Sequence, residues 1–323
     1  MKRINFALGL AALALLPAAW PVQAQAQTPL KIVIGFPPGG AVDSLARTLA
    51  DRLRVSLNTT VLVDNKPGAN TFLAMDTVKR APPDGSTVLI NFSPAFTIYP
   101  YTFQKLPYDA QQDFVPVAQL VRFPLALSAG ANQPYRNFEE YRRWLQGAPG
   151  RAAIGMPGAG TSAHFAVLEI GKSIGVDMAA VAYKGGAAIL ADEMGGHIGA
   201  GIDSIGSKLE LYRSGKIRLL AVTGSRRTPL APDVPSFGEL GVKGLDYPSG
   251  WYGAFTTAGT PPDVVQKLAR AFNEALQDPA ARRQLENFGL EVAGSTPAEL
   301  RATIESDSRF WQPVVRATGF KAD

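Results

Sequence analysis

The chain has 323 residues, of which 46% are hydrophobic and 18% charged, and it contains no cysteine. This composition excludes a disordered or fibrous protein, because it supplies enough apolar side chains for one large core or two ordinary cores. The lack of cysteine excludes disulfides, thiolate chemistry and cysteine-ligated metals. The 32 basic residues outnumber the 27 acidic ones, but they form no block of five, so nucleic acid is not an expected partner.

Residues 1–26 have the pattern of a secretory signal. Two basic residues precede an apolar run over 6–16, and the small-x-small sequence Ala24-Gln25-Ala26 follows. We expect cleavage before Gln27, which lowers the net charge from +5 to +3 because two basic residues are removed. A membrane anchor is the alternative, but spanning a bilayer takes about 18 to 20 apolar residues and this run is shorter. The mature protein is expected to be periplasmic, soluble and, without cysteine, not lipid-anchored.

From residue 30, short β-branched runs alternate with amphipathic stretches, which predicts an α/β fold with mostly parallel sheets. The first part is expected to form strands at 31–36, 60–63, 87–91 and 114–121 and a helix at 42–57. In the middle part we expect strands at 152–156, 178–182, 198–202 and 217–222 and helices at 162–174 and 187–194. Three helices that each begin with proline are expected to close the chain, at 262–277, 279–288 and 297–317.

Two extended segments punctuated by proline and glycine, 123–133 and 244–252, are interpreted as crossings between two lobes. The mature chain is about twice the usual domain size of about 100 to 150 residues, which also favours two lobes. Lobe 1 is then expected to contain 27–127 plus 251–323, and lobe 2 to contain 128–250. Two crossings form a hinge, and a cleft is expected at the carboxyl ends of the strands.

The loop after the first expected strand, Phe36-Pro37-Pro38-Gly39-Gly40, leads into a helix with Asp43 in its first turn. Glycine lets backbone N–H groups approach a ligand, and a helix N-terminus supplies unpaired donors with partial positive charge. The loop therefore suits an anion. An ordinary strand-to-helix turn, with Asp43 favourable to the helix dipole, explains the same residues.

A second loop of this kind covers 155–164 and contains Gly160, Thr161, Ser162 and His164. Hydroxyls and N–H groups at a helix start suit a carboxylate as well as a phosphate, although either hydroxyl can instead cap the helix. The glycine pattern is only a weak variant of the dinucleotide fingerprint, because the acid expected for a ribose contact is misplaced. His164 is interpreted as a ligand donor or as a satisfied helix histidine.

Further candidate ligand contacts follow other expected strands. Tyr183 and Lys184 would place a phenol and a cation at the cleft, although a solvated lysine beside a glycine turn is the alternative. Asp203 could accept from an amino group, a hydroxyl or water, or could cap the next helix. Asn91, at the end of the strand expected at 87–91, completes the candidate set.

Catalytic and metal sites have less support. Ser162 and Ser204 are the candidate nucleophiles of an exported hydrolase, but Ser204 lacks the Gly-x-Ser-x-Gly frame. On a helix, His164 projects about 200° away from Ser162, which is poor geometry for a nucleophile and its base. With only one other histidine, His197, a histidine-rich metal site is excluded. We therefore expect no metal and no cofactor.

A series of motifs extends over residues 30–323. They are the 36–43 loop, Asn65-Lys66-Pro67-Gly68-Ala69, Ala81-Pro82-Pro83-Asp84-Gly85, Leu106-Pro107-Tyr108-Asp109, the 158–164 loop, Tyr183-Lys184-Gly185, Gly195-Gly196-His197, the run at 215–223, Pro232-Asp233-Val234-Pro235, Trp251-Tyr252-Gly253 and Ala258-Gly259-Thr260-Pro261. In this order the motifs resemble those of the substrate-binding receptors of tripartite tricarboxylate transporters, often named the Bug family.

The resemblance implies a two-lobed periplasmic binding protein of type II-like fold, a Venus flytrap that closes on a small organic acid. It implies that the 36–43 and 158–164 loops grip the ligand carboxylate from opposite lobes, partly through ordered water. The chain departs from the family at 70–74, where Asn-Thr-Phe-Leu-Ala replaces further glycines, and at Ala163, where a third hydroxyl is frequent.

The resemblance favours a receptor that is not an enzyme and that delivers its ligand to membrane transporter subunits. An exported hydrolase, or a receptor that signals to a sensor protein, remains as an alternative. The expected ligand is a small carboxylate, and the expected assembly is a monomer. A carboxylate clamp is shared by receptors for dicarboxylates, aromatic acids, amino acids and nicotinate-like ligands, so the sequence does not name the acid.

Overall fold

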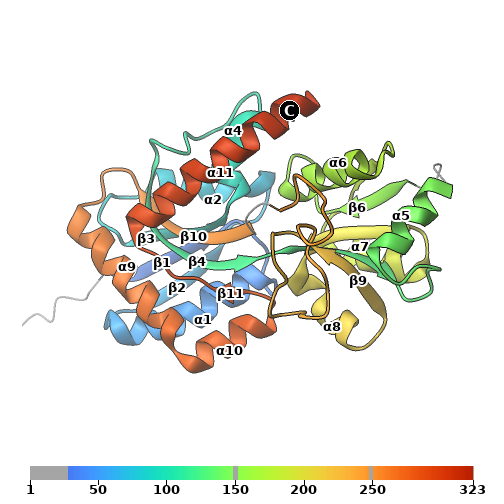
Figure 1. Cartoon of the computed structure of the whole chain (residues 1–323). Coiled ribbons are helices and arrows are strands. Elements are labelled where there is room, and N and C mark those ends of the chain that lie inside the picture. The colour runs from blue at the N-terminus through green and yellow to red at the C-terminus, as the bar shows by residue number, and fades with distance from the viewer. Residues whose placement is uncertain (1–27, 148–151, 247–249, 323) are drawn as a thin grey trace, which may run out of the picture.

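The structure, a computed structural model, describes residues 28–147, 152–246 and 250–322. The expected signal segment and its cleavage site lie outside these ranges. Two α/β lobes lie side by side, each built on one sheet (Figure 1). Within the described ranges, no helix combines the length and the apolar character needed to cross a bilayer.

Lobe 1 is built on a six-stranded sheet of order β11-β4-β10-β3-β1-β2. Its strands are β1 (Leu30–Ile34), β2 (Val61–Asn65), β3 (Thr87–Phe92), β4 (Phe114–Phe123), β10 (Gly250–Thr257) and β11 (Glu291–Val292). Lobe 2 is built on a five-stranded sheet of order β7-β6-β8-β5-β9. Its strands are β5 (Leu125–Gly130), β6 (Ala153–Met156), β7 (Ala179–Ala182), β8 (Ala200–Ser204) and β9 (Ile217–Val222).

Both sheets are mixed, although most of their strands point one way. β1 pairs in parallel with β2 and β3, and β6 pairs in parallel with β7 and β8. β10 lies antiparallel between β3 and β4, and β5 lies antiparallel between β8 and β9. Most strands of each sheet therefore point in one direction, as expected. The pairings that β5 and β10 make with their neighbours are antiparallel, which was not expected.

The chain passes from the first sheet to the second almost without interruption. β4 ends at Phe123 and β5 begins at Leu125, so only Pro124 separates them. The sequence predicted an extended crossing here and did not predict β5, whose residues are all buried. A side chain at Gly130 would clash with the backbone of Glu193, so this glycine permits close packing and does not mark a loop.

Helices cover both sheets. Lobe 1 carries α1 (Ala41–Ser56), α2 (Phe72–Lys79), α3 (Pro94–Thr97), α4 (Tyr99–Thr102), α9 (Pro262–Gln277), α10 (Pro279–Asn287) and the start of α11 (Pro297–Thr318). Lobe 2 carries α5 (Phe138–Gly147), α6 (Ser162–Ile174), α7 (Gly186–Gly195) and α8 (Leu209–Arg213). Short 3₁₀ turns cover Ala69–Thr71 and Ile205–Ser207. The helices predicted at 42–57, 162–174, 187–194, 262–277, 279–288 and 297–317 are present within one residue at each end.

The last helix connects the two lobes. Thr296 and Glu299 form a capping box that fixes its start on lobe 1, where Leu300 is buried in an aromatic core. Farther along α11, Trp311 and Val315 are buried in the core of lobe 2. The helix therefore contributes apolar side chains to the cores of both lobes.

Candidate functional site

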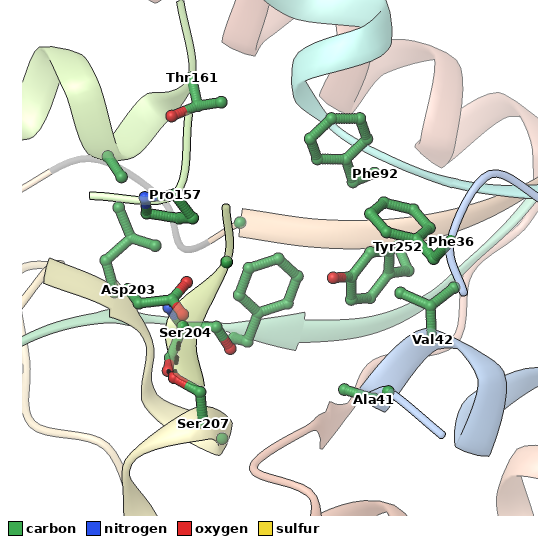
Figure 2. Close-up of a pocket in the computed structure, with 18 of the residues that line it drawn as sticks. Phe36, Ala41, Val42, Phe92, Pro157, Thr161, Asp203, Ser204, Ser207 and Tyr252 are labelled. Carbon is green, nitrogen blue, oxygen red and sulfur yellow. Dashed lines mark hydrogen bonds between the residues drawn. The ribbon is translucent and has the colours of Figure 1, made fainter. Parts of the chain in front are cut away.

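A cavity of about 570 Å³ lies between the lobes and receives side chains from both of them (Figure 2). It is lined by the loops that precede α1, α6 and α7 and by the ends of β3, β4, β8 and β10. This volume lies within the usual range for small-molecule sites, about 300 to 1,000 Å³. The lining includes six of the predicted site residues, namely Phe36, Gly39, Gly40, Thr161, Ser162 and Asp203.

The start of α1 faces the cavity through Gly39, Gly40, Ala41 and Val42. Gly39 has φ +87°, a left-handed conformation that glycine adopts without strain, and this turn aims the loop at the cavity. The first N–H groups of a helix have no partner within the helix. The N-cap residue Gly40 has no side chain to satisfy them, so they are available to an anion in the cavity.

Asp43 does not line the cavity but holds this loop from behind. Its Oδ2 accepts from the Gly39 N–H at 3.0 Å and from Arg47 Nε at 2.9 Å, and its Oδ1 accepts from Asn65 Nδ2 at 3.0 Å. Burial alone would raise the pKa of Asp43, but these hydrogen bonds and the Arg47 charge lower it to about 2. Pro38 is exposed and lies outside the lining.

The start of α6 faces the cavity from lobe 2 through Thr161, Ser162 and Ala163. Thr161 is the N-cap: its hydroxyl accepts from the His164 N–H at 3.4 Å and donates to the Gly158 carbonyl at 3.0 Å. Thr161 therefore both caps α6 and lines the cavity, so the two roles considered for it from the sequence are compatible. As in α1, the N–H groups of the first turn have no partner within the helix.

His164 and Gly160 lie behind this loop and do not line the cavity. The Gly160 N–H donates to His164 Nδ1 at 3.1 Å, so the ring holds the loop in place. The ring also packs edge-to-face against Phe320, with the ring centres 4.7 Å apart. Burial lowers the pKa of His164, which favours the neutral form that accepts this hydrogen bond.

The start of α7 reaches the cavity through Gly185 and Gly186, whereas the neighbouring predicted residues point elsewhere. The Tyr183 hydroxyl donates to Asp192 Oδ2 at 2.7 Å, and Lys184 is exposed. The prediction that these two side chains line the cleft is therefore not matched by the cavity, because Tyr183 is turned toward Asp192 of α7 and Lys184 toward solvent.

Asp203 lies at the end of β8 and faces the cavity. Its Oδ1 accepts from the Ser204 N–H at 2.7 Å and its Oδ2 from the Ser207 hydroxyl at 3.0 Å. A side chain at Gly186 would clash with Oδ2, so the carboxylate sits against the first turn of α7. Desolvation raises the pKa of Asp203, although Lys208 and these hydrogen bonds act in the opposite direction.

Asn91 is fully buried and lies outside the cavity lining. Its Nδ2 donates to Thr71 Oγ1 at 3.0 Å, which ties β3 to the segment at 70–74. Successive side chains of a strand point to opposite faces, so the next residue, Phe92, reaches the cavity instead. Phe72 of the same segment packs against Phe103 with ring centres 5.1 Å apart, inside lobe 1.

Sequence reasoning missed an aromatic wall. Phe92, Phe123 and Tyr252 line the cavity together with Phe36. The Phe36 and Phe92 rings meet at 5.4 Å and nearly at right angles, and Phe123 and Tyr252 lie 4.8 Å apart. These residues could have been predicted as cavity-lining from one feature of the sequence, a large aromatic residue at the end of an expected strand.

The fold and this geometry can be compared with known proteins. The family model described as tripartite tricarboxylate transporter family receptor (TctC) matches residues 45–320. The chain belongs to this family. It is 31% identical over 298 residues to protein BugT of Bordetella pertussis, covering 91% of this chain and 90% of BugT.

Two solved structures from Rhodopseudomonas palustris are similar along almost the whole chain. MatC with bound malate is 27% identical with a TM-score of 0.78, covering 92% of this chain and 100% of MatC. A second protein, with adipate, is 27% identical with a TM-score of 0.83, covering 91% of this chain and 99% of its own. The chain is therefore a solute-binding receptor and not an enzyme, and the hydrolase alternative is wrong.

Proposed function

We propose that this receptor is exported to the periplasm, captures a small organic acid in the cavity between its lobes, and delivers it to a tripartite tricarboxylate-type transporter. The observation that carries the proposal is the meeting of two helix N-termini at one cavity. α1 comes from lobe 1 and α6 from lobe 2, and each presents first-turn N–H groups that suit a carboxylate. The relatives with malate and adipate support an organic acid as the ligand.

The binding mode follows from the residues that surround these N-termini. Among the described residues that line the cavity there is no lysine, arginine or histidine. Backbone N–H groups and hydroxyls then hold the carboxylate, because hydrogen bonds to an ionised group are stronger than those between neutral groups. The Ser162 hydroxyl lies beside this position and can donate to the carboxylate, whereas the Thr161 hydroxyl already donates to the Gly158 carbonyl.

Binding closes the lobes in this proposal. Each lobe supplies only half of the donors, so bringing both halves onto one ligand is the step that gains differential binding energy. We expect the hinge at Pro124, between β4 and β5, and in the second crossing expected at 244–252, of which residues 247–249 lie outside the described ranges. The proposed lobes are those expected from the sequence, 27–127 plus 251–323 and 128–250, with the first boundary moved to Pro124 and the second to just before Gly250, because β5 belongs to the lobe 2 sheet and β10 to the lobe 1 sheet.

The test replaces Gly40 with valine and measures carboxylate binding by titration calorimetry with malate, adipate, benzoate and 4-hydroxybenzoate. A Cβ at Gly40 would have only the Pro37 carbonyl near it, at 4.0 Å, so the fold should tolerate valine while the branched side chain obstructs the N–H groups. Gly147→Val is the matched control, because Gly147 lies at the end of α5 with open space around it. Loss of binding in Gly40→Val alone supports the proposal, and unchanged affinity removes the α1 loop from the site.

A further inference from the structure

The cavity has two unlike walls (Figure 2). The aromatic wall of Phe36, Phe92, Phe123 and Tyr252 belongs to lobe 1, and Figure 2 shows Phe36, Phe92 and Tyr252 on that side. Asp203, Ser204 and Ser207 form a polar wall on the side of lobe 2. A ligand that bridges the lobes therefore contacts aromatic rings of lobe 1 and side-chain oxygen atoms of lobe 2.

The charges in the cavity restrict which group of the ligand can contact those oxygen atoms. Asp203 is the acidic side chain of the lining, and Lys208, the cation that attracts it, lies outside the described lining and is paired with Glu193. A second carboxylate on the ligand would face the half-buried Asp203 carboxylate, and like charges that are partly withdrawn from water repel each other at a cost. A hydroxyl or an amino group would instead gain an acceptor.

Asp203 has room for such a donor. An ionised carboxylate has about four acceptor positions, and the two hydrogen bonds from Ser204 and Ser207 leave others open. The carboxylate also sits against the first turn of α7, as the clash expected for a side chain at Gly186 shows. Because Asp203 already complements the positive end of α7, the N-termini of α1 and α6 remain for the ligand's carboxylate.

We propose that the ligand is an aromatic monocarboxylate that also carries a hydrogen-bond donor apart from its carboxylate, and that Asp203 selects this donor and rejects a second carboxylate. This inference rests on the proposed function as a carboxylate receptor. The ring lies among Phe36, Phe92 and Tyr252, and the carboxylate lies between the first turns of α1 and α6. Selection against dicarboxylates would separate this receptor from its relatives with malate and adipate.

The first experiment compares the binding of 4-hydroxybenzoate, benzoate and terephthalate by titration calorimetry. A second series compares 3-(4-hydroxyphenyl)propanoate with 3-phenylpropanoate, in which two carbons separate the ring from the carboxylate. We expect the hydroxyl compound of a series to bind about ten- to hundredfold more tightly than its unsubstituted partner, because a hydrogen bond to a charged acceptor contributes that much. Terephthalate should bind at least about tenfold more weakly than benzoate. A preference for terephthalate, adipate or malate over the hydroxyl acids would overturn the inference and leave the proposed function intact.

The second experiment uses Asp203→Asn, which keeps the size of the side chain and an acceptor but removes its charge. The advantage of the hydroxyl acid should fall to about threefold or less, and terephthalate should bind at least about tenfold more tightly than in the wild type. Asp177→Asn, an exposed acid outside the cavity, is the control and should keep the wild-type ranking. An unchanged ranking in a folded Asp203→Asn variant would overturn the inference.

The aromatic part has its own comparison. Trans-4-hydroxycyclohexanecarboxylate carries the same two end groups on a ring without a π-system. It should bind several-fold more weakly than 4-hydroxybenzoate, because contacts between aromatic rings contribute beyond their buried area. Equal or tighter binding would overturn the aromatic assignment, and no binding by any acid of the panel would overturn the proposed function itself.

Discussion

The Nζ atom of Lys208 lies 3.2 Å from Oε1 of Glu193, and neither side chain has any exposed surface. The Ser128 hydroxyl joins them, at 2.5 Å from Nζ and 2.7 Å from the same carboxylate oxygen. This buried network connects β5, α7 and the turn that leads into α8. Because Asp203 lies between the start of α7 and that turn, the network holds the polar wall of the cavity in place.

Removing one partner of this pair should be costly. In Glu193→Gln the Lys208 charge stays buried without its counter-charge, and we expect the free energy of unfolding to fall by about 3–5 kcal/mol. Urea denaturation measures this loss. The double variant Glu193→Gln, Lys208→Met should recover much of it, since no unpaired charge is left. A loss below about 1 kcal/mol in the single variant would contradict the role given to the pair.

Asp307 in α11 accepts a hydrogen bond from Trp251 Nε1 at 2.8 Å in a buried position. Desolvation raises its pKa to about 6, against the effect of the Trp251 bond and the Arg122 charge. Because the pKa is raised in the folded state, the contribution of Asp307 to the free energy of unfolding is fully present below the pKa of the unfolded chain, about 3.9. This contribution is lost as the pH rises through about 6. Asp307→Asn keeps the acceptor without the charge, so it should be about 1–3 kcal/mol more stable than the wild type at pH 7.

Thermal unfolding between pH 4 and pH 7 tests this prediction. The difference in Tm between Asp307→Asn and the wild type should shrink toward zero as the pH falls, because the wild-type carboxyl becomes protonated. A variant that is less stable than the wild type at pH 7, or a difference independent of pH, would count against it.

His164 should make the α6 loop sensitive to acid. Burial lowers the pKa of His164, so its contribution to stability is present above the unfolded value of about 6.5 and is lost as the pH falls through the folded value. Protonation of Nδ1 also removes the acceptor of the Gly160 N–H. We expect Tm to fall between pH 7.5 and pH 5 more steeply in the wild type than in His164→Asn, which offers an acceptor that does not titrate. Equal slopes would show that the histidine does not control the loop.

The two lobes touch where Gly206, before α8, packs against the backbone of Phe288 and Gly289, after α10. A Cβ at Gly206 would clash with the Phe288 carbonyl, whereas Gly206 is not among the residues with positive φ, so its backbone conformation suits alanine. Gly206→Ala should therefore oppose closure without unfolding either lobe. We expect at least about tenfold weaker carboxylate binding and a larger radius of gyration at saturating ligand than in the wild type.

Small-angle scattering with and without 4-hydroxybenzoate provides the measurement. Gly147→Ala, at an open position far from the lobe contact, is the control and should behave as the wild type does. If the wild type binds the acid with no change in its radius of gyration, large closure of the hinge is not the mechanism.

The sequence predicted the elements whose patterns are local. α6 and α9 begin and end at the predicted residues, because each has a clear start signal and an apolar face. β5 and β10 were not predicted, because their glycines and the proline before β5 are typical of loops when only the sequence is considered. In the fold, both strands lie inside a sheet between partners from distant parts of the chain.

The same distinction applies to the site. The loops before α1 and α6 were predicted as anion sites from their glycines and hydroxyls, and both line the cavity. Tyr252 was missed because it lies on an unpredicted strand, and Asn91 was misplaced because the facing direction of a strand residue depends on register. Side chains that point away from the cavity, such as Tyr183, bond to partners that only the folded chain brings near.

In the proposed binding mode, helix N-termini from both lobes hold the ligand's carboxylate. A crystal structure of the receptor with the acid that binds most tightly in the calorimetric comparison tests it most directly. We expect carboxylate oxygens within hydrogen-bond distance of first-turn N–H groups of both α1 and α6, with the rest of the ligand among Phe36, Phe92 and Tyr252. A carboxylate held by a lysine or arginine outside this cavity, or by only one of the two helices, would contradict the claim.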